Sequence, residues 1–172
     1  MLKKLFIAVL FGAFAVASIS AQKNVDNFVG TWKLTKTEGL PKTSTVQKVT
    51  LDISQTADAI RIERTSEGVN NNQKYSFNNI ESFDVKNGTS VSLVAGQFGG
   101  TLKNQLRVLA ANRLRFDSVL DRDLTTVSAR EIWTLSSDGK TLTIETFSRY
   151  SSKNAPENSG GGVSTKMTFS KE

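Results

Sequence analysis

Apolar and polar residues alternate along most of this chain, and short turns rich in glycine, asparagine, aspartate and serine separate the alternating segments. Between residues 47 and 53, for example, valine, leucine and isoleucine occupy every second position. A period of two is typical of β-strands that bury one face and expose the other. The pattern predicts about nine or ten strands and no helix beyond the N-terminal segment. These strands include residues 29–38, 47–53, 59–65 and 141–150, with shorter segments at 73–77 and 80–85.

The connections between the predicted strands are short, which favours antiparallel neighbours. Asn87-Gly88 and Asp138-Gly139 are typical of the tight turns of β-hairpins. The glycines within residues 96–100 indicate a bulge or a barrel corner. Residues 151–162 are rich in serine, asparagine and glycine and are predicted to form a loop. We therefore predict an all-β fold, an antiparallel up-and-down meander closed into a β-barrel of about 8–10 strands. Closure is favoured because it removes exposed strand edges, and a two-sheet sandwich is the alternative.

The first 21 residues have the three parts of a secretory signal peptide. Two lysines precede an apolar run, and small residues follow it up to Ala21. The run is too short for a membrane span, and without a cysteine after it a bacterial lipid anchor is excluded. We expect cleavage near Ala21, a single domain over residues 22–172, and a secreted or periplasmic protein without a membrane anchor.

Composition narrows the chemistry that this domain could perform. The chain has no cysteine and no histidine. We therefore expect no disulfide, no metal site built on thiolate or imidazole, no histidine-ligated haem and no Ser-His-Asp machinery, and we predict no cofactor. The formal net charge is +6 at pH 7, but basic residues mostly lie beside acidic ones, as in residues 61–64. This mixture indicates a solvated surface rather than a nucleic-acid-binding one.

The segment Gly30-Thr31-Trp32, which opens the first predicted strand, resembles the Gly-x-Trp signature of lipocalins and their calycin relatives. Residues 131–144 and 165–171 are similar to the late hairpin and last strand of small secreted bacterial lipocalin-like proteins. In such a signature, Gly30 lets the chain turn into the strand, and the Trp32 indole plugs one end of the barrel.

The resemblance implies a cup-shaped barrel that binds a small apolar or amphipathic molecule. It also implies a late arginine that stacks over the plug, but this chain has no arginine in its final strand. Arg149 and Lys166 are the substitutes that the sequence offers as partners of Trp32. The haem-binding relatives use a histidine ligand that is absent here, so haem binding is not implied.

Several apolar residues on the inward faces of the predicted strands are mixed with small polar ones, a composition typical of small-molecule pockets. Ordinary core packing accounts for the same residues equally well. The candidate cavity residues are Tyr75, Asn104, Leu106, Val108, Leu114, Phe116, Ser118, Glu131 and Trp133, and we also place Phe147 among the lining residues.

Glu131 is the unusual member of this set, because alternation places its carboxylate between Ala129 and Trp133 on an inward face. An ionised carboxylate inside a barrel needs a partner or water. Three interpretations remain open: an ion pair with Arg149 or Lys166, a polar anchor for a ligand, or an outward position after a slip of register by one residue.

Three classes of function are compatible with these features. The leading hypothesis is a secreted, non-enzymatic lipocalin-like barrel that binds or carries a small hydrophobic or amphipathic molecule, and we expect it to be a monomer. The alternative is a protein–protein interaction or inhibitor-type barrel with a packed interior. A barrel enzyme that uses carboxylates is third, because no catalytic motif accompanies the carboxylates of this chain.

Overall fold

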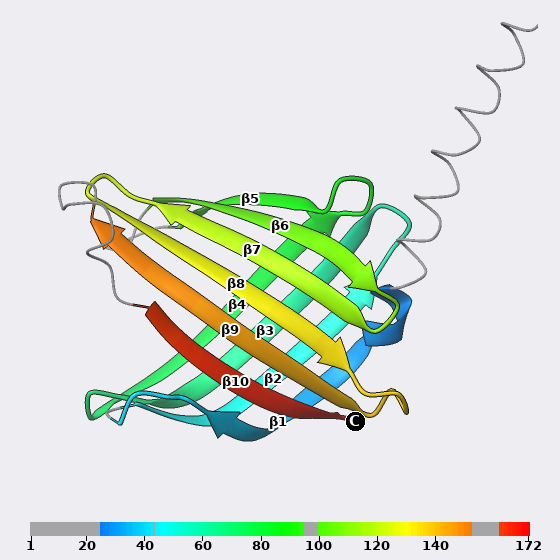
Figure 1. Ribbon diagram of the computed structural model, residues 1–172, viewed down its shortest axis with the longest axis horizontal. Helices are drawn as coiled ribbons and strands as arrows, with labels where there is room; N and C mark the ends of the chain where they lie inside the picture. The colour runs from blue at the N-terminus through cyan, green and yellow to red at the C-terminus, as the bar shows by residue number, and fades with distance from the viewer. Residues whose placement is uncertain (1–24, 43, 95–99, 153–161) are drawn as a thin grey trace, which may run out of the picture.

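Ten antiparallel strands wind around a common interior in the computed structural model (Figure 1). The structure describes residues 25–42, 44–94, 100–152 and 162–172. The predicted signal peptide at 1–21, residues 96–99 of the glycine segment and most of the 151–162 loop lie outside this range. A 3-10 helix, η1 (Asp26–Phe28), is followed by β1 (Gly30–Glu38), β2 (Ser44–Gln55), β3 (Ala59–Asn70), β4 (Gln73–Asp84), β5 (Thr89–Val94), β6 (Gly100–Ala110), β7 (Arg113–Asp121), β8 (Thr125–Leu135), β9 (Thr141–Ser152) and β10 (Gly162–Lys171).

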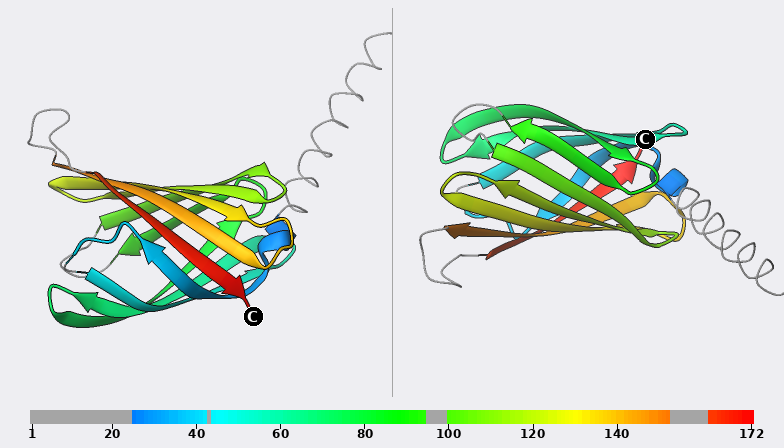
Figure 2. Two further views of the ribbon diagram at one scale, coloured as in Figure 1. Left: turned by 60° about the horizontal axis from the view of Figure 1, so that its bottom comes forward. Right: turned by 90° about the horizontal axis from the view of Figure 1, so that it is seen from above.

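The strands form one sheet in the order β4-β3-β2-β1-β10-β9-β8-β7-β6-β5. Every sequential neighbour is paired antiparallel except β4 and β5, and β10 closes against β1. The predicted all-β meander, nearly closed into a barrel, is confirmed. Figure 2 shows the two ends of this sheet, β4 and β5, brought to the same side of the barrel by its curvature. A single continuous sheet replaces the two-sheet sandwich that the sequence left open.

Two local features differ from the sequence prediction. Segments 73–77 and 80–85 belong to one strand, β4, because the asparagines between them extend it. Asn78 donates a hydrogen bond to Glu63 over 2.9 Å, and Asn79 donates one to Glu81 over 2.7 Å. The helix η1 was not expected, and it brings the fully buried Phe28 under one end of the barrel.

The packed core occupies only one end of the barrel, which we call the closed end. It holds η1 and contains the buried side chains Val25, Phe28, Trp32, Val49, Leu51, Ile53, Ile60, Ile62, Phe83, Leu106, Leu114, Phe116, Trp133, Leu135, Leu142, Ile144 and Phe169. Further along the same strand faces, large side chains are about half exposed: Phe77 by 49%, Tyr150 by 50% and Val163 by 44%. These residues nevertheless belong to the inward face, because their partners in the neighbouring strands do. Phe77, for example, lies opposite buried Ser66. We call this half the open end.

Trp32 lies at the closed end and is completely buried. Its indole Nε1 donates a hydrogen bond to the Phe28 carbonyl oxygen over 2.9 Å, which ties η1 to β1. Gly30 precedes it with φ of +134°, a conformation that side chains disfavour. The Lys171 Nζ atom lies 5.2 Å from the centroid of the Trp32 ring, within the range of a cation–π contact.

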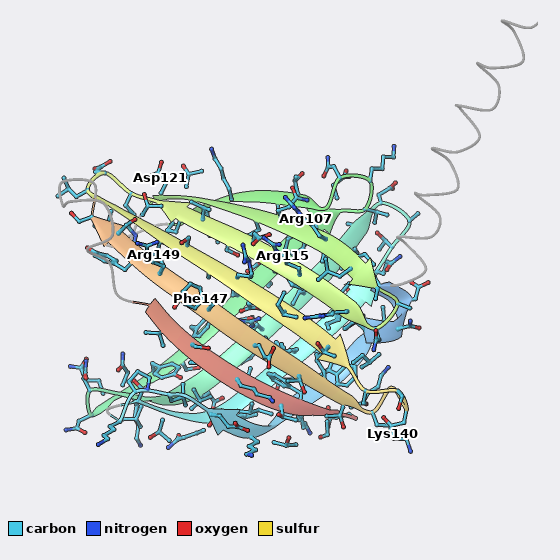
Figure 3. All side chains as sticks on the ribbon, in the orientation of Figure 1. Arg107, Arg115, Asp121, Lys140, Phe147 and Arg149 are labelled. Atoms are coloured by element: carbon cyan, nitrogen blue, oxygen red, sulfur yellow. The ribbon has the colours of Figure 1, made fainter. Side chains whose placement is uncertain are left out.

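Lys171 therefore has the stacking role for which Arg149 and Lys166 were the expected substitutes, and that expectation is wrong. Lys166 pairs with Glu145 and Glu38 in the ladders, on the face opposite to that of buried Phe169. Arg149 lies toward the open end of β9, on the outer face (Figure 3). Lys171 is the last residue of β10, so only the register of β10 against β1 brings it over the indole.

Trp32→Ala should lower the free energy of unfolding by about 3–5 kcal/mol, because it leaves a large cavity in the packed end. Phe147→Ala is the matched aromatic control on the exposed outer face and should cost under about 1 kcal/mol. Denaturant unfolding followed by circular dichroism measures both. Equal losses in the two variants would contradict the role of Trp32 as the plug.

Candidate functional site

Arg64 points into the barrel from the middle of β3. It follows Ile60 and Ile62 at every second position, so it continues their inward face beyond the core. Its Nη1 and Nη2 atoms donate hydrogen bonds to the two carboxylate oxygens of Glu131 on β8, over 3.1 and 2.9 Å. The interpretation of residues 61–64 as a solvated surface is therefore wrong for Arg64. It holds for Arg61, which is exposed and bonds to Glu63.

Glu131 accepts a third hydrogen bond, from the Trp133 indole Nε1 over 2.8 Å. Of the three interpretations of this carboxylate, the ion pair is the one observed, but its partner is Arg64 and neither Arg149 nor Lys166. Arg64 also lies over the Trp133 ring, with 6.0 Å between the guanidinium carbon and the ring centroid. The side chains are only 31% and 18% exposed for Arg64 and Glu131. The pair is therefore a partly buried, bidentate contact across the interior.

A second carboxylate, Glu81 on β4, lies beside this pair on the inward face that also carries Phe83. Its Oε1 atom accepts a hydrogen bond from Asn79 Nδ2 over 2.7 Å, and its Oε2 atom accepts one from Asn104 Nδ2 over 3.2 Å. We call Arg64, Glu81 and Glu131 the buried charge cluster. It contains two carboxylates and one guanidinium.

The two carboxylates of the cluster respond differently to burial. Burial raises the pKa of Glu81, since its attraction to Arg64 and its bond from Asn79 do not compensate, and Glu131 adds repulsion. Burial also opposes ionisation of Glu131, but the charge and hydrogen bonds of Arg64 and the bond from Trp133 outweigh it, so the pKa of Glu131 is lowered. The hydrogen bonds of Arg64 go to Glu131, and Glu81 is the carboxylate that remains poorly compensated.

A cavity of about 40 Å³ lies against the buried charge cluster. Its wall combines apolar and aromatic side chains with polar groups: Ile62, Arg64, Asn79, Glu81, Phe116, Ser118, Glu131 and Trp133. Since one water fills about 30 Å³ of liquid, this space suits a small polar group rather than a whole ligand of ordinary size. It lies where the packed core ends, because Ile62 and Trp133 belong to the core and the cluster follows them along the strands.

The candidate cavity residues from the sequence fall into four places. Phe116, Ser118, Glu131 and Trp133 line the cavity, and Asn104 bonds to Glu81 beside it. Leu106 and Val108 line a second cavity, of about 140 Å³, next to the β4–β5 turn. Leu114 is buried in the packed core. Tyr75 lies near the β3–β4 turn, where its ring covers Gly68, and it does not reach the charge cluster.

Phe147, also expected to line the interior, is on the outer face and 53% exposed (Figure 3). Its neighbours in the ladder are Arg130 and Ser164, and the inward positions of β9 are those of Leu142 and Ile144. The aromatic character of Phe147 suggested an inward position, but alternation along β9 places it on the outer face.

The sequence analysis missed Arg64, Asn79 and Glu81. Strict alternation from Ile60 and Ile62 would have placed Arg64 inside, and alternation back from Phe83 would have placed Glu81 and Asn79 there. The prediction of two separate strands on either side of residues 78–79 prevented alternation from being followed along β4.

The described part of the chain contains no group of three or more acidic, histidine or cysteine residues arranged to hold a metal ion. Within the same residues, no helix has the length and apolarity needed to cross a membrane.

No protein-family model matches this chain, and no curated protein matches it. Among solved structures, a mutant of the fluorescent protein UnaG has 14% sequence identity and a TM-score of 0.47, with 86% of this chain and 98% of that chain covered. A Schistosoma mansoni fatty acid binding protein in complex with arachidonic acid has 12% identity and a TM-score of 0.49, covering 87% and 98%.

Arg64→Met should cost about 3–5 kcal/mol of stability, because it leaves Glu131 buried without its charge partner. The double variant Arg64→Met with Glu131→Gln should recover a large part of that loss, since no unpaired charge remains. Urea unfolding of the wild type, both single variants and the double variant gives the coupling energy. Additive losses would contradict a direct pair.

Glu81→Gln should stabilise the protein at neutral pH and lose this advantage in acid. A raised pKa means that the folded state holds the Glu81 proton more tightly than the unfolded state does, so wild-type stability falls as pH rises above the ordinary glutamate range. The stability difference between variant and wild type should grow with pH until Glu81 is ionised. Glu145→Gln, on the outer face of β9, controls for the change in total charge. A stability difference between Glu81→Gln and wild type that shrinks with rising pH would contradict the burial of an ionised Glu81 as the cause.

Proposed function

We propose that this protein is an exported, non-enzymatic barrel that binds a small hydrophobic or amphipathic molecule in the open half of its interior. The observation that carries the proposal is the contrast between the two halves. Inward side chains are 7% exposed or less throughout the core of the closed end, whereas Phe77, Tyr150 and Val163 on the same faces stay about half exposed. Large side chains on the inward faces of the open half therefore stay accessible to a ligand.

The position of the buried charge cluster supports the same function. Arg64 follows the core residue Ile62 along β3, and Glu131 precedes the core residue Trp133 along β8. The cluster therefore forms the floor of the open half, above the packed core. Buried ion pairs contribute little net stability compared with apolar side chains, so a purely stabilising role does not account for the cluster, whereas a polar group at the floor of a pocket does.

The wall above this floor is apolar and aromatic. Tyr75 and Phe77 lie together on β4, with 6.4 Å between their ring centroids, and Tyr150 lies on the inward face of β9 opposite Val127. A ligand with one polar end and one apolar body matches a polar floor and an aromatic wall. The alternative of an interaction module with a packed interior agrees with the closed half of the barrel, whereas the accessible aromatic side chains of the open half favour a ligand.

Export rests on the sequence of the first 21 residues. Expression of the full chain in a bacterial host with a periplasm should yield a mature protein that begins at or near Gln22, as read by N-terminal sequencing. Recovery of the whole chain from the cytoplasm, with its first residues retained, would contradict export.

Binding can be measured with N-phenyl-1-naphthylamine, a neutral apolar dye whose fluorescence rises in apolar surroundings. We expect saturable binding to the wild type. Ala129→Phe places a bulky ring on the inward face next to Glu131 and should weaken binding at least about tenfold, a loss of about 1.4 kcal/mol.

Ser128→Phe is the matched control, because Ser128 is exposed on the outer face of the same strand. It should leave dye binding unchanged. Equal binding by wild type and Ala129→Phe, or no binding by the wild type, would contradict an interior site. Circular dichroism of each variant confirms that the barrel is formed.

A further inference from the structure

We propose that the floor of the open half selects ligands that end in an amine and rejects ligands that end in a carboxylate. This inference rests on the proposed binding function and specifies the polar group that enters the cavity above the buried charge cluster. It follows from which hydrogen-bonding positions in the floor are already occupied.

Arg64 is the only cation lining this cavity among the described residues, and its charge is already paired with that of Glu131. Its two terminal nitrogens bond to the two Glu131 oxygens in a fork-to-fork arrangement, and its guanidinium lies over the Trp133 ring. The Glu131 carboxylate engages two of the five N–H donors of the guanidinium, so a ligand carboxylate would compete with Glu131 for a cation whose charge is already balanced. Drawing Arg64 away from Glu131 would weaken the pairing of a partly buried carboxylate, which is unfavourable.

Glu131 is also occupied, since it already accepts three hydrogen bonds from Arg64 and Trp133. Glu81 differs, because each of its oxygens accepts a single bond from a neutral amide. A carboxylate has about four acceptor positions, so Glu81 retains acceptor capacity at the cavity wall.

Asn104 supplies a second, independent sign of a missing donor. This side chain is buried, its Nδ2 atom bonds to Glu81, and its Oδ1 atom has no hydrogen-bond partner among the described residues. Asn104 lies directly opposite Ser118 in the β6–β7 ladder, and Ser118 lines the cavity. Buried acceptors without partners are rare in folded proteins, and this one lies beside the cluster, because Asn104 bonds to Glu81 and is the ladder partner of a cavity-lining residue.

The charge balance points to the same ligand. With both carboxylates ionised, the cluster carries one positive and two negative charges. An ammonium group would neutralise it, whereas a carboxylate would add a second excess negative charge in a region of low dielectric constant. The cavity of about 40 Å³ has room for an ammonium group, and the apolar body of the ligand would lie along the aromatic wall toward the open end.

The test compares three ligands with the same ten-carbon chain, decylamine, decanol and decanoic acid, each below its micelle concentration or, for decanol, its solubility limit. Their affinities are measured at neutral pH by displacement of N-phenyl-1-naphthylamine. We expect decylamine to bind at least about tenfold more tightly than decanol, and decanoic acid to bind most weakly. The chain carries a net charge of +6, so non-specific attraction would favour the acid, which is the opposite order.

Glu81→Gln keeps the shape and one acceptor oxygen but removes the charge. It should lower the affinity for decylamine at least about tenfold and leave that for decanol nearly unchanged. Glu145→Gln is the matched control, because it removes a carboxylate from the outer face, and it should preserve the preference for the amine.

Decanoic acid binding as tightly as decylamine, or an amine preference that survives in Glu81→Gln, would overturn this inference and leave the proposed function intact. Equal affinities for all three ligands would overturn it as well. Failure of the dye and all three ligands to bind the wild type would instead refute the proposed function on which the inference rests.

Discussion

The ion pair between Arg64 and Glu131 is the contact on which the interior of this barrel depends. Five ladder steps separate β3 from β8 in the sheet, through β2, β1, β10 and β9. The pair therefore crosses the interior and connects walls that no backbone hydrogen bond joins. Below it the inward positions carry the packed core, and above it large inward side chains such as Phe77, Tyr150 and Val163 are about half exposed. One bidentate contact marks the boundary between a core and a space that a ligand could enter.

Keeping charges at this boundary has a physical cost that the closed end offsets. The core there combines Phe28, Trp32 and Phe169 with aliphatic side chains from most of the strands, so it supplies apolar burial without any disulfide. The cluster is satisfied unevenly: Glu131 is held by three donors, whereas Glu81 is held by two neutral amides. That asymmetry makes Glu81 the group most open to a further donor, and it is the origin of the ligand preference that we infer.

Much of the fold could be predicted from the sequence because local patterns determine it. Alternation identified the strands, Asn87-Gly88 and Asp138-Gly139 identified tight turns, and short connections led to the meander. The site was less predictable, because contacts across a barrel depend on closure and register. Glu131 was correctly placed inside, but its partner Arg64 is 67 residues away and sits among surface-like charges. Lys171 over Trp32 is a similar case, since only the pairing of the first and last strands brings them together.

The central claim is that a ligand occupies the open half, above the charge cluster, while the closed end stays sealed. The two tryptophans report on these places separately, because the Trp133 indole N–H bonds to Glu131 and the Trp32 indole N–H bonds to Phe28. Titration of ¹⁵N-labelled protein with N-phenyl-1-naphthylamine, followed by NMR, should shift the Trp133 indole resonance in a saturable way and leave that of Trp32 in place. A shift confined to Trp32, or no shift of either resonance, would contradict the account.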